Sequence, residues 1–238
     1  MAASWTLPEP LLPGHEPAAV DLLQRYFGTV SNGDPAYTGS RFERFARGGD
    51  LPEIKNQIVP SDLVSVTLLS VKVPGSAALR LLGDHPTEHP QKISLLLEKL
   101  PTNVELVSAT DEHLVDANEL WQRVRRGCKV GPTTTSKLLA RKRPHLLPVI
   151  DSVVSTELNH NNRRLDFYRE MRRILNADDR ALYRRLQQMR GAAGVGDDIS
   201  IIRVFDVVVW MYGSDQQRPR VPRTPAQTTH DDQGARSR

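Results

Sequence analysis

Apolar residues along most of the chain recur at the three-to-four-residue spacing of an amphipathic helix. In the segment 111–126, Leu114, Leu120 and Trp121 fall on one face with charged residues between them. Pro132 suits the first position of a helix, where its missing N–H costs nothing. The predicted helices cover residues 18–27, 61–71, 76–82, 90–100, 111–126, 132–142, 148–158, 163–176, 177–190 and 199–212.

The last predicted helix, 199–212, is apolar nearly all round, which indicates burial within a helical bundle. Arg203 and Asp206 lie three residues apart on it, and charges in such a helix need compensation. We interpret them as a structural ion pair, with the lining of a pocket as the alternative. The segment 103–107 could be extended, but it is too short to define a sheet. The pattern therefore predicts an all-α fold, a compact multi-helix bundle.

We expect one helical domain over residues 16–213. Proline-rich residues 1–15 predict a flexible N-terminus, and residues 214–238 have the aliphatic-poor composition of a disordered basic tail. No apolar run approaches the ~20 residues of a membrane helix, and the N-terminus does not resemble a signal peptide. The single cysteine, Cys128, permits no internal disulfide. These features predict a cytoplasmic protein with no membrane partner.

Charge is distributed unevenly along the chain. Residues 1–119 carry 9 Lys or Arg and 16 Asp or Glu, whereas residues 120–238 carry 23 and 12. Eight basic residues and no acidic one fall within 120–147, a one-signed stretch that concentrates anions around it. Such a stretch is also typical of a solvated helical face. The nine arginines within 163–190 could extend a basic surface or belong to two solvated helices.

A short turn in this basic stretch, residues 127–131, separates two predicted helices. The first N–H groups of the second helix lack partners, and the helix dipole makes them an anion site. Gly131 leaves the backbone open to a phosphate. The residues predicted to contact a DNA backbone are Arg126, Lys129, Val130, Gly131, Thr133, Thr134 and Lys137. Further positive charge is expected from Arg123, Arg125, Arg141, Lys142 and Arg143.

Val130-Gly131-Pro132-Thr133-Thr134-Thr135, followed by Pro148-Val149-Ile150-Asp151-Ser152-Val153-Val154, resembles the helix-hairpin-helix DNA glycosylase superfamily. There, a hairpin of the form Gly-Val-Gly-x-Lys-Thr-Ala grips the DNA backbone, and a Val-Asp-Thr-type segment downstream supplies the catalytic aspartate. Asp151 lies 18 positions after Thr133, a separation similar to the family's. The resemblance covers a central helix-hairpin-helix-like element over about residues 113–158. The whole chain also resembles an actinobacterial family of uncharacterised proteins.

The chain departs from the family pattern at several positions. Lys129 replaces the first glycine of the hairpin, and Thr133 stands where bifunctional members keep a Schiff-base lysine. One cysteine cannot hold a four-cysteine iron–sulfur cluster. The resemblance therefore implies a DNA duplex as partner, no cofactor, and Asp151 as the catalytic carboxylate of a monofunctional glycosylase without a lyase step. Asp151 also suits the N-cap of the helix after it, and the two roles are compatible.

Two minor candidates lie in the first half of the chain. The segment 37–45 could stack an extruded base with Tyr37, Arg41, Phe42 and Phe45, although aromatic residues at this spacing more often belong to a core. His85 and His89 suggest a metal site, but prolines interrupt any helix there, so we expect no metal.

Two functions remain open. The first is a DNA-binding protein that grips the phosphate backbone. If this protein is also an enzyme, it is a monofunctional base-excision glycosylase. The second is a non-enzymatic module for protein interaction or self-association on the same helical scaffold, in which the acidic and basic halves of the chain dock a partner or each other.

Overall fold

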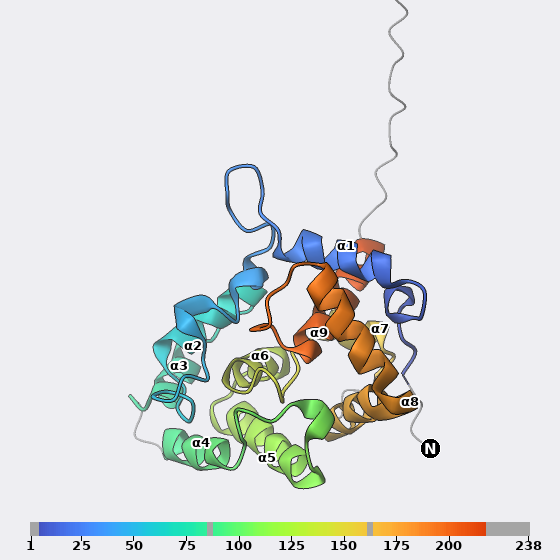
Figure 1. The fold of residues 1–238 in the computed structure, drawn as a ribbon. Helices are drawn as coiled ribbons and strands as arrows, with labels where there is room; N and C mark the ends of the chain where they lie inside the picture. Colours follow the sequence, from blue (N-terminus) through green and yellow to red (C-terminus); the bar gives the residue numbers. More distant parts are fainter. Residues whose placement is uncertain (1–4, 85–87, 161–163, 218–238) are drawn as a thin grey trace, which may run out of the picture.

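The computed structural model describes residues 5–84, 88–160 and 164–217, and in these ranges the predicted all-α fold is confirmed (Figure 1). An isolated bridge between Thr29 and Pro35 is the β pairing found in the described ranges. The α-helices are α1 (Glu16–Phe27), α2 (Pro60–Ser65), α3 (Gly75–Leu82), α4 (His89–Glu98), α5 (Asp111–Gly127), α6 (Pro132–Lys142), α7 (Ser152–Glu157), α8 (Arg164–Ala192) and α9 (Ile201–Gln217).

Helix α6 lies near the middle of the assembly in Figure 1. It contacts α5 on one side and α2 on another, and α5 in turn packs against α4 and α8. Helices α1, α8 and α9 pack against one another, and α7 packs against α9. One cluster of buried apolar side chains runs through these helices, except that α2 adds only the partly buried Leu63 to its edge. Only the first turn of α6 reaches the surface, which decides what its side chains can contact.

The start of α6 agrees with its prediction because proline occupies its first position. Helix α7 is shorter than predicted and begins at Ser152, since the Asp151 carboxylate accepts a hydrogen bond from the Val154 N–H at 3.1 Å and caps it. The helix predicted over 61–71 divides into α2 and a 3-10 turn, Val66–Leu69.

Helix α8 covers both helices predicted between residues 163 and 190. Its backbone leaves the helical conformation at Ala177, and Asp178, Asp179 and Arg180 have positive φ angles of 49°, 52° and 61°. The two halves on either side of this kink therefore correspond to the two predicted helices.

The expected flexible N-terminus and disordered tail are only partly described. Trp5 and Leu11 are buried in the core, so residues 5–15 contribute to the folded unit. Helix α9 continues to Gln217, which makes 214–217 helical. The remaining predicted tail, 218–238, and residues 1–4 lie outside the described residues.

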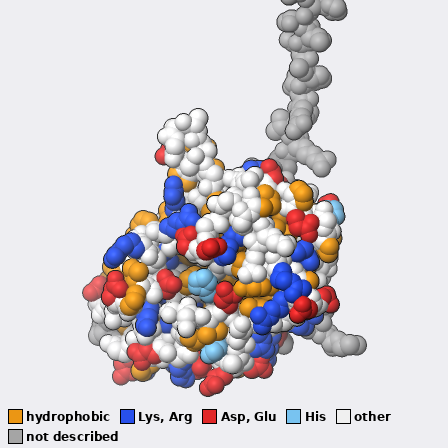
Figure 2. Space-filling model, in the orientation of Figure 1, with side chains coloured by type: hydrophobic (Ala, Val, Ile, Leu, Met, Phe, Trp, Pro, Cys, Tyr) orange, Lys and Arg blue, Asp and Glu red, His pale blue; other side chains and the backbone are white. Residues whose placement is uncertain are grey.

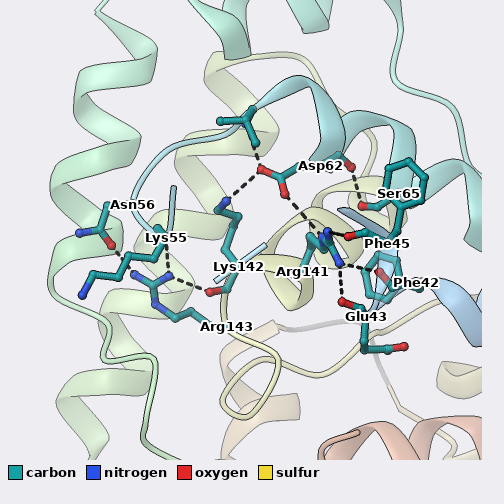
Figure 3. Close-up of polar contacts among 11 residues, drawn as sticks. Phe42, Glu43, Phe45, Lys55, Asn56, Asp62, Ser65, Arg141, Lys142 and Arg143 are labelled. Carbon is teal, nitrogen blue, oxygen red and sulfur yellow. Dashed lines mark hydrogen bonds and ion pairs between the residues drawn. The ribbon is translucent and has the colours of Figure 1, made fainter. Parts of the chain in front are cut away.

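Arg141, Lys142 and Arg143 are fully buried, which corrects the expectation that they contribute to a basic surface (Figure 3). Lys142 Nζ lies 2.9 Å from Asp62 Oδ2. Arg141 Nη1 donates to the carbonyl oxygens of Phe42 at 2.6 Å and Glu43 at 2.7 Å. Because the C-terminal end of α6 enters the protein interior, these side chains hold loops of the first half of the chain.

Arg143 makes the same kind of contact on the other side of α6 (Figure 3). Its guanidinium donates to the Leu100 carbonyl at 2.6 Å, the Lys55 carbonyl at 2.7 Å and the Asn56 side chain at 2.7 Å. Burial lowers the pKa of Arg143 to about 10. The three cations thus serve the fold: Arg141 and Arg143 bind backbone carbonyls and Lys142 binds the Asp62 carboxylate, where a surface cation would bind a phosphate.

Acidic and basic residues from the two halves of the chain pair with each other. On the face drawn in Figure 2, the two signs are interspersed. Pairs that join the halves are Arg203–Glu43, Arg141–Asp62, Lys142–Asp62, Arg172–Asp111, Arg185–Glu16, Arg25–Asp215 and Arg44–Asp198. Part of the charge asymmetry therefore reflects intramolecular pairing.

Candidate functional site

The hairpin, residues 128–131, joins α5 to α6 and presents the start of α6 at the surface. Lys129 has the left-handed backbone conformation that glycine favours, with φ 57°, at the position where the resembling family keeps its first glycine. Gly131 has extended backbone angles and is exposed, and no heavy atom lies within 4 Å of a Cβ built on it. The open space at Gly131 leaves the first N–H groups of α6 accessible to an anion.

The structure divides the predicted backbone contacts into two groups. Arg126, Lys129 and Gly131 are exposed, and Thr133 is half-buried. Val130, Thr134 and Lys137 are buried. The side chains of the second group do not reach the surface of the hairpin because α6 turns into the protein after its first turn. Contact of Val130, Thr134 and Lys137 with a duplex therefore stays a prediction for their backbone groups, and their buried side chains do not contribute to it.

Lys137 lies beside Asp151 at the base of a cleft. Its Nζ donates to the Leu69 carbonyl at 2.8 Å and lies 3.8 Å from Asp151 Oδ2. Burial lowers the pKa of Lys137, and the Asp151 carboxylate opposes that shift. The Asp151 side chain is 13% exposed, so it caps α7 with one oxygen and still reaches the cleft. A cap and a reactive carboxylate are compatible in this geometry.

The first part of the cleft, here called the aromatic cavity, encloses about 230 Å³. Tyr26 and Tyr37 stack with ring centroids 5.3 Å apart, and Trp210 meets Tyr37 edge-on at 6.0 Å. Of the aromatic residues proposed for base stacking, Tyr37 lines this cavity, whereas Phe42 is buried elsewhere in the core. The cavity is lined by Tyr26, Tyr37, Thr38, Gly39, Leu68, Leu69, Ser70, Thr133, Lys137, Val149, Asp151, Ser152, Arg203, Asp206, Val207 and Trp210.

Arg203 and Asp206 form the polar floor of the aromatic cavity. They make the predicted ion pair and also line a pocket, so both interpretations of this pair hold. Arg203 Nε lies 2.6 Å from Glu43 Oε1, and Arg203 Nη2 donates to the Tyr26 hydroxyl at 2.7 Å. Burial raises the pKa of Asp206 to about 7, against the opposing effect of Arg203. Two buried carboxylates thus share one guanidinium.

The second part of the cleft, here called the arginine cavity, encloses about 600 Å³. Thr133, Asp151 and Ser152 line both cavities and form a ridge between them. The Cζ atoms of Arg125 and Arg164 each lie 5.1 Å from the centroid of the Trp121 ring. The cavity is lined by Trp121, Arg125, Pro132, Thr133, Ile150, Asp151, Ser152, Ser155, Thr156, Asn159, His160 and Arg164.

Several lining residues were not identified from the sequence as parts of a site. Trp121 was assigned only to the core of its helix, and Arg164 only to a run of arginines. The amphipathic pattern of α5 does place Trp121 toward the interior. No local signal could show that Arg164, three helices later in the chain, packs over the same ring.

Cys128 lies outside both cavities, and the one described histidine that lines the cleft is His160, in the arginine cavity. Cys128, the first residue of the hairpin, is buried, and burial raises the pKa of its thiol to about 11. Among the described residues, no group of three or more His, Cys, Asp or Glu side chains is arranged to hold a metal ion. His85 lies outside those residues. No helix in the described parts of the chain combines the length and apolarity needed to cross a membrane.

The fold and the cleft define an all-α protein with a two-part cavity where α6 and α7 begin. The chain belongs to DUF6308, a family of unknown function, which matches residues 19–213. No curated protein and no solved structure matches the chain.

Proposed function

We propose that this protein binds duplex DNA at the hairpin and hydrolyses the N-glycosidic bond of one nucleotide held over Asp151. The observation that carries the proposal is the position of Asp151 on the ridge between an aromatic and a cationic cavity. A nucleotide has the same order of parts, an aromatic base, a sugar and a phosphate. A nucleotide that spanned the ridge would have its sugar next to the Asp151 carboxylate.

The aromatic cavity offers the base stacking surfaces and polar partners. Tyr37 and Trp210 supply ring faces and edges, and Arg203 and Asp206 supply a hydrogen-bonding floor. An enzyme that acts on a base within a duplex must first extrude it, and such a cavity compensates for the lost stacking.

The Asp151 carboxylate would stabilise positive charge at C1′ of the sugar. The C1′–N bond breaks with both electrons leaving on the base nitrogen, which a proton then neutralises. Water adds to C1′ and loses a proton, so the products are the free base and an abasic sugar. Lys137 Nζ, 3.8 Å from Asp151 Oδ2 and hydrogen-bonded to the Leu69 carbonyl, holds the carboxylate in place. It is a positioning residue in this scheme.

Contacts to the duplex backbone come from the exposed part of the hairpin. Arg126 and Lys129 supply charge, and the open backbone at Gly131 with the half-buried Thr133 supplies donors. Such contacts orient a duplex without reading its sequence.

The binding test is a duplex titration at ~50 and ~200 mM salt with wild type and Gly131→Asp. Two or three neutralised phosphates predict a log–log salt slope of about −2 to −3. Gly131 is exposed, has room for a side chain and caps α6, where aspartate is a good cap, so the variant should fold normally. Its carboxylate would occupy the anion site and abolish binding.

Gly75→Asp is the matched control, because Gly75 also lies at the start of a helix and has open space where a side chain would extend. It adds the same charge at another helix start and should bind as wild type does. Equal binding by wild type and Gly131→Asp would remove the hairpin from the proposal. Binding to a protein partner, insensitive to salt, would favour the interaction-module hypothesis instead.

The catalytic test uses duplexes that each carry one deaminated, oxidised or alkylated base. Strand cleavage after hot alkali reports abasic product. Asp151→Asn keeps the cap on α7, since asparagine caps helices as well as aspartate does, but it removes the carboxylate charge. We expect normal folding and duplex binding with loss of product. Full activity in Asp151→Asn would refute the assigned role, and a borohydride-trapped adduct would refute the absence of a lyase step.

A further inference from the structure

Arg164 is a buried cation that the described protein atoms leave without an oxygen partner. It is 9% exposed, and its Nε has no hydrogen-bond partner among the described residues. The other buried arginines of the described chain contact carbonyl or carboxylate oxygens, as Arg141, Arg143 and Arg203 illustrate. An unpaired buried charge is costly, so buried charges normally have a partner.

Positive charge accumulates around the same cavity. Arg125 lies over the same Trp121 ring as Arg164, and the two cations repel each other. The first turn of α6, at Pro132 and Thr133, adds the positive end of a helix of 11 residues. The indole N–H of Trp121 is also buried without a partner among the described residues. An anion in this cavity would offset the positive charge that gathers around it.

We propose that the arginine cavity is a binding site for a phosphate group, with Arg164 as its principal ligand. A guanidinium group can bind two phosphate oxygens through two parallel hydrogen bonds. The Trp121 ring beneath Arg164 limits the orientations that the Arg164 guanidinium can adopt. This site rests on the proposed function, because it would bind the phosphate of the nucleotide held over Asp151. It concerns the cavity beside the hairpin and makes no use of the surface contacts at Lys129 and Gly131.

The probes are inorganic phosphate, a deoxynucleoside 5′-monophosphate, the unphosphorylated nucleoside and the dinucleoside monophosphate TpT, all at constant ionic strength. Binding is followed by calorimetry and by the rise in melting temperature. Phosphate and the monophosphate should bind, and the nucleoside should bind more weakly. Stronger binding of TpT would identify a polynucleotide backbone as the source of the phosphate, whereas stronger binding of the monoester would identify a terminal phosphate or a free nucleotide. Absence of binding by all three phosphate-containing probes would overturn the proposal.

Arg164→Met is the first variant. It keeps an unbranched apolar stem over Trp121 and removes the unpaired charge, so the protein without ligand should melt at or above the wild-type temperature. Phosphate affinity should fall about ten- to a hundredfold, as expected for lost charge-assisted hydrogen bonds. Arg169→Met removes an exposed arginine from the same helix and should leave the affinity unchanged. Equal phosphate binding by Arg164→Met and wild type would refute the assignment.

Thr156→Glu is a second variant, since Arg164→Met could disturb packing. Thr156 is exposed at the edge of the cavity, so a carboxylate there competes with phosphate for the arginines without altering the core. Thr156→Gln is its neutral control. Loss of phosphate binding in the glutamate variant alone supports the site, and equal binding in both argues against it.

The outcomes also separate this inference from the duplex proposal. Duplex binding that depends on Gly131, without any phosphate binding that depends on Arg164, would refute the phosphate site and leave the hairpin proposal standing. Phosphate binding that depends on Arg164, without duplex binding that depends on Gly131, would establish the phosphate site and refute the hairpin as a duplex contact.

Discussion

Replacing Asp62 with asparagine should strongly destabilise the fold. Asp62 is fully buried, with Lys142 Nζ at 2.9 Å and Arg141 Nε at 3.6 Å from its two oxygens. Its Oδ2 also accepts from the Val59 N–H at 3.0 Å. Asparagine preserves the shape and an acceptor for Val59, so the change mainly removes the negative charge. It leaves two buried cations without a carboxylate.

Removing one member of a buried ion pair typically costs about 3–5 kcal/mol. For a chain of this size, each kcal/mol shifts the melting temperature by about 2–4 °C, which predicts a decrease of about 6–20 °C. Arg141 keeps its bonds to the Phe42 and Glu43 carbonyls, so the lower half of this range is favoured. Burial already lowers the pKa of Lys142, and loss of Asp62 would lower it further. The deficit should therefore shrink as the pH rises from 7 towards 10, because neutral lysine needs no counter-charge.

Thermal and denaturant unfolding of wild type and Asp62→Asn test this prediction. Asp198→Asn is the matched control, since the Arg44–Asp198 pair is shorter still at 2.5 Å but Asp198 is 52% exposed. An exposed pair contributes about 1 kcal/mol or less. If Asp62→Asn lowers the melting temperature no more than Asp198→Asn does, the cluster around α6 does not depend on a buried carboxylate.

Three further predictions concern the hairpin and the cleft floor. Lys129→Gly should have a free energy of unfolding about 1 kcal/mol higher than that of Lys129→Ala, because both variants lose the charge but only glycine relieves the φ of 57°. Equal melting temperatures of the two variants would contradict the assigned backbone strain. Burial raises the pKa of Asp206 to about 7, and the charged groups that face it are Arg203, Asp151 and Lys137. The contribution of Asp206 to stability is therefore present at low pH and is lost as the pH rises through 7. The stability of wild type relative to Asp206→Asn should therefore decline between about pH 4 and 8, and a constant difference would refute the shift. The Cys128 thiol should resist alkylation at pH 8 in the native state and react after unfolding, because burial raises its pKa.

Local pattern was sufficient to predict most helices, because capping and amphipathic spacing act within a few residues. Pro132 predicted the first residue of α6, and the all-apolar surface of α9 predicted its burial. The Arg203–Asp206 pair was also predictable, since both residues lie on one helix three positions apart. Asp151 could be identified as a cap because its partner, Val154, is three residues away.

The sequence alone therefore determined the fold class, the main helices, the hairpin and Asp151 as a candidate residue. Only the tertiary structure decided which charges are exposed, because burial depends on how distant segments pack. Arg126 and Arg141 belong to one basic stretch, yet the first is exposed and the second is held by carbonyls from the first half of the chain, the Phe42 carbonyl lying 99 residues earlier. Tertiary packing likewise brought Lys137 to Asp151 and Arg164 to Trp121. Contacts between residues far apart in sequence leave no periodic signal along the chain, so the two cavities became visible only in the folded protein.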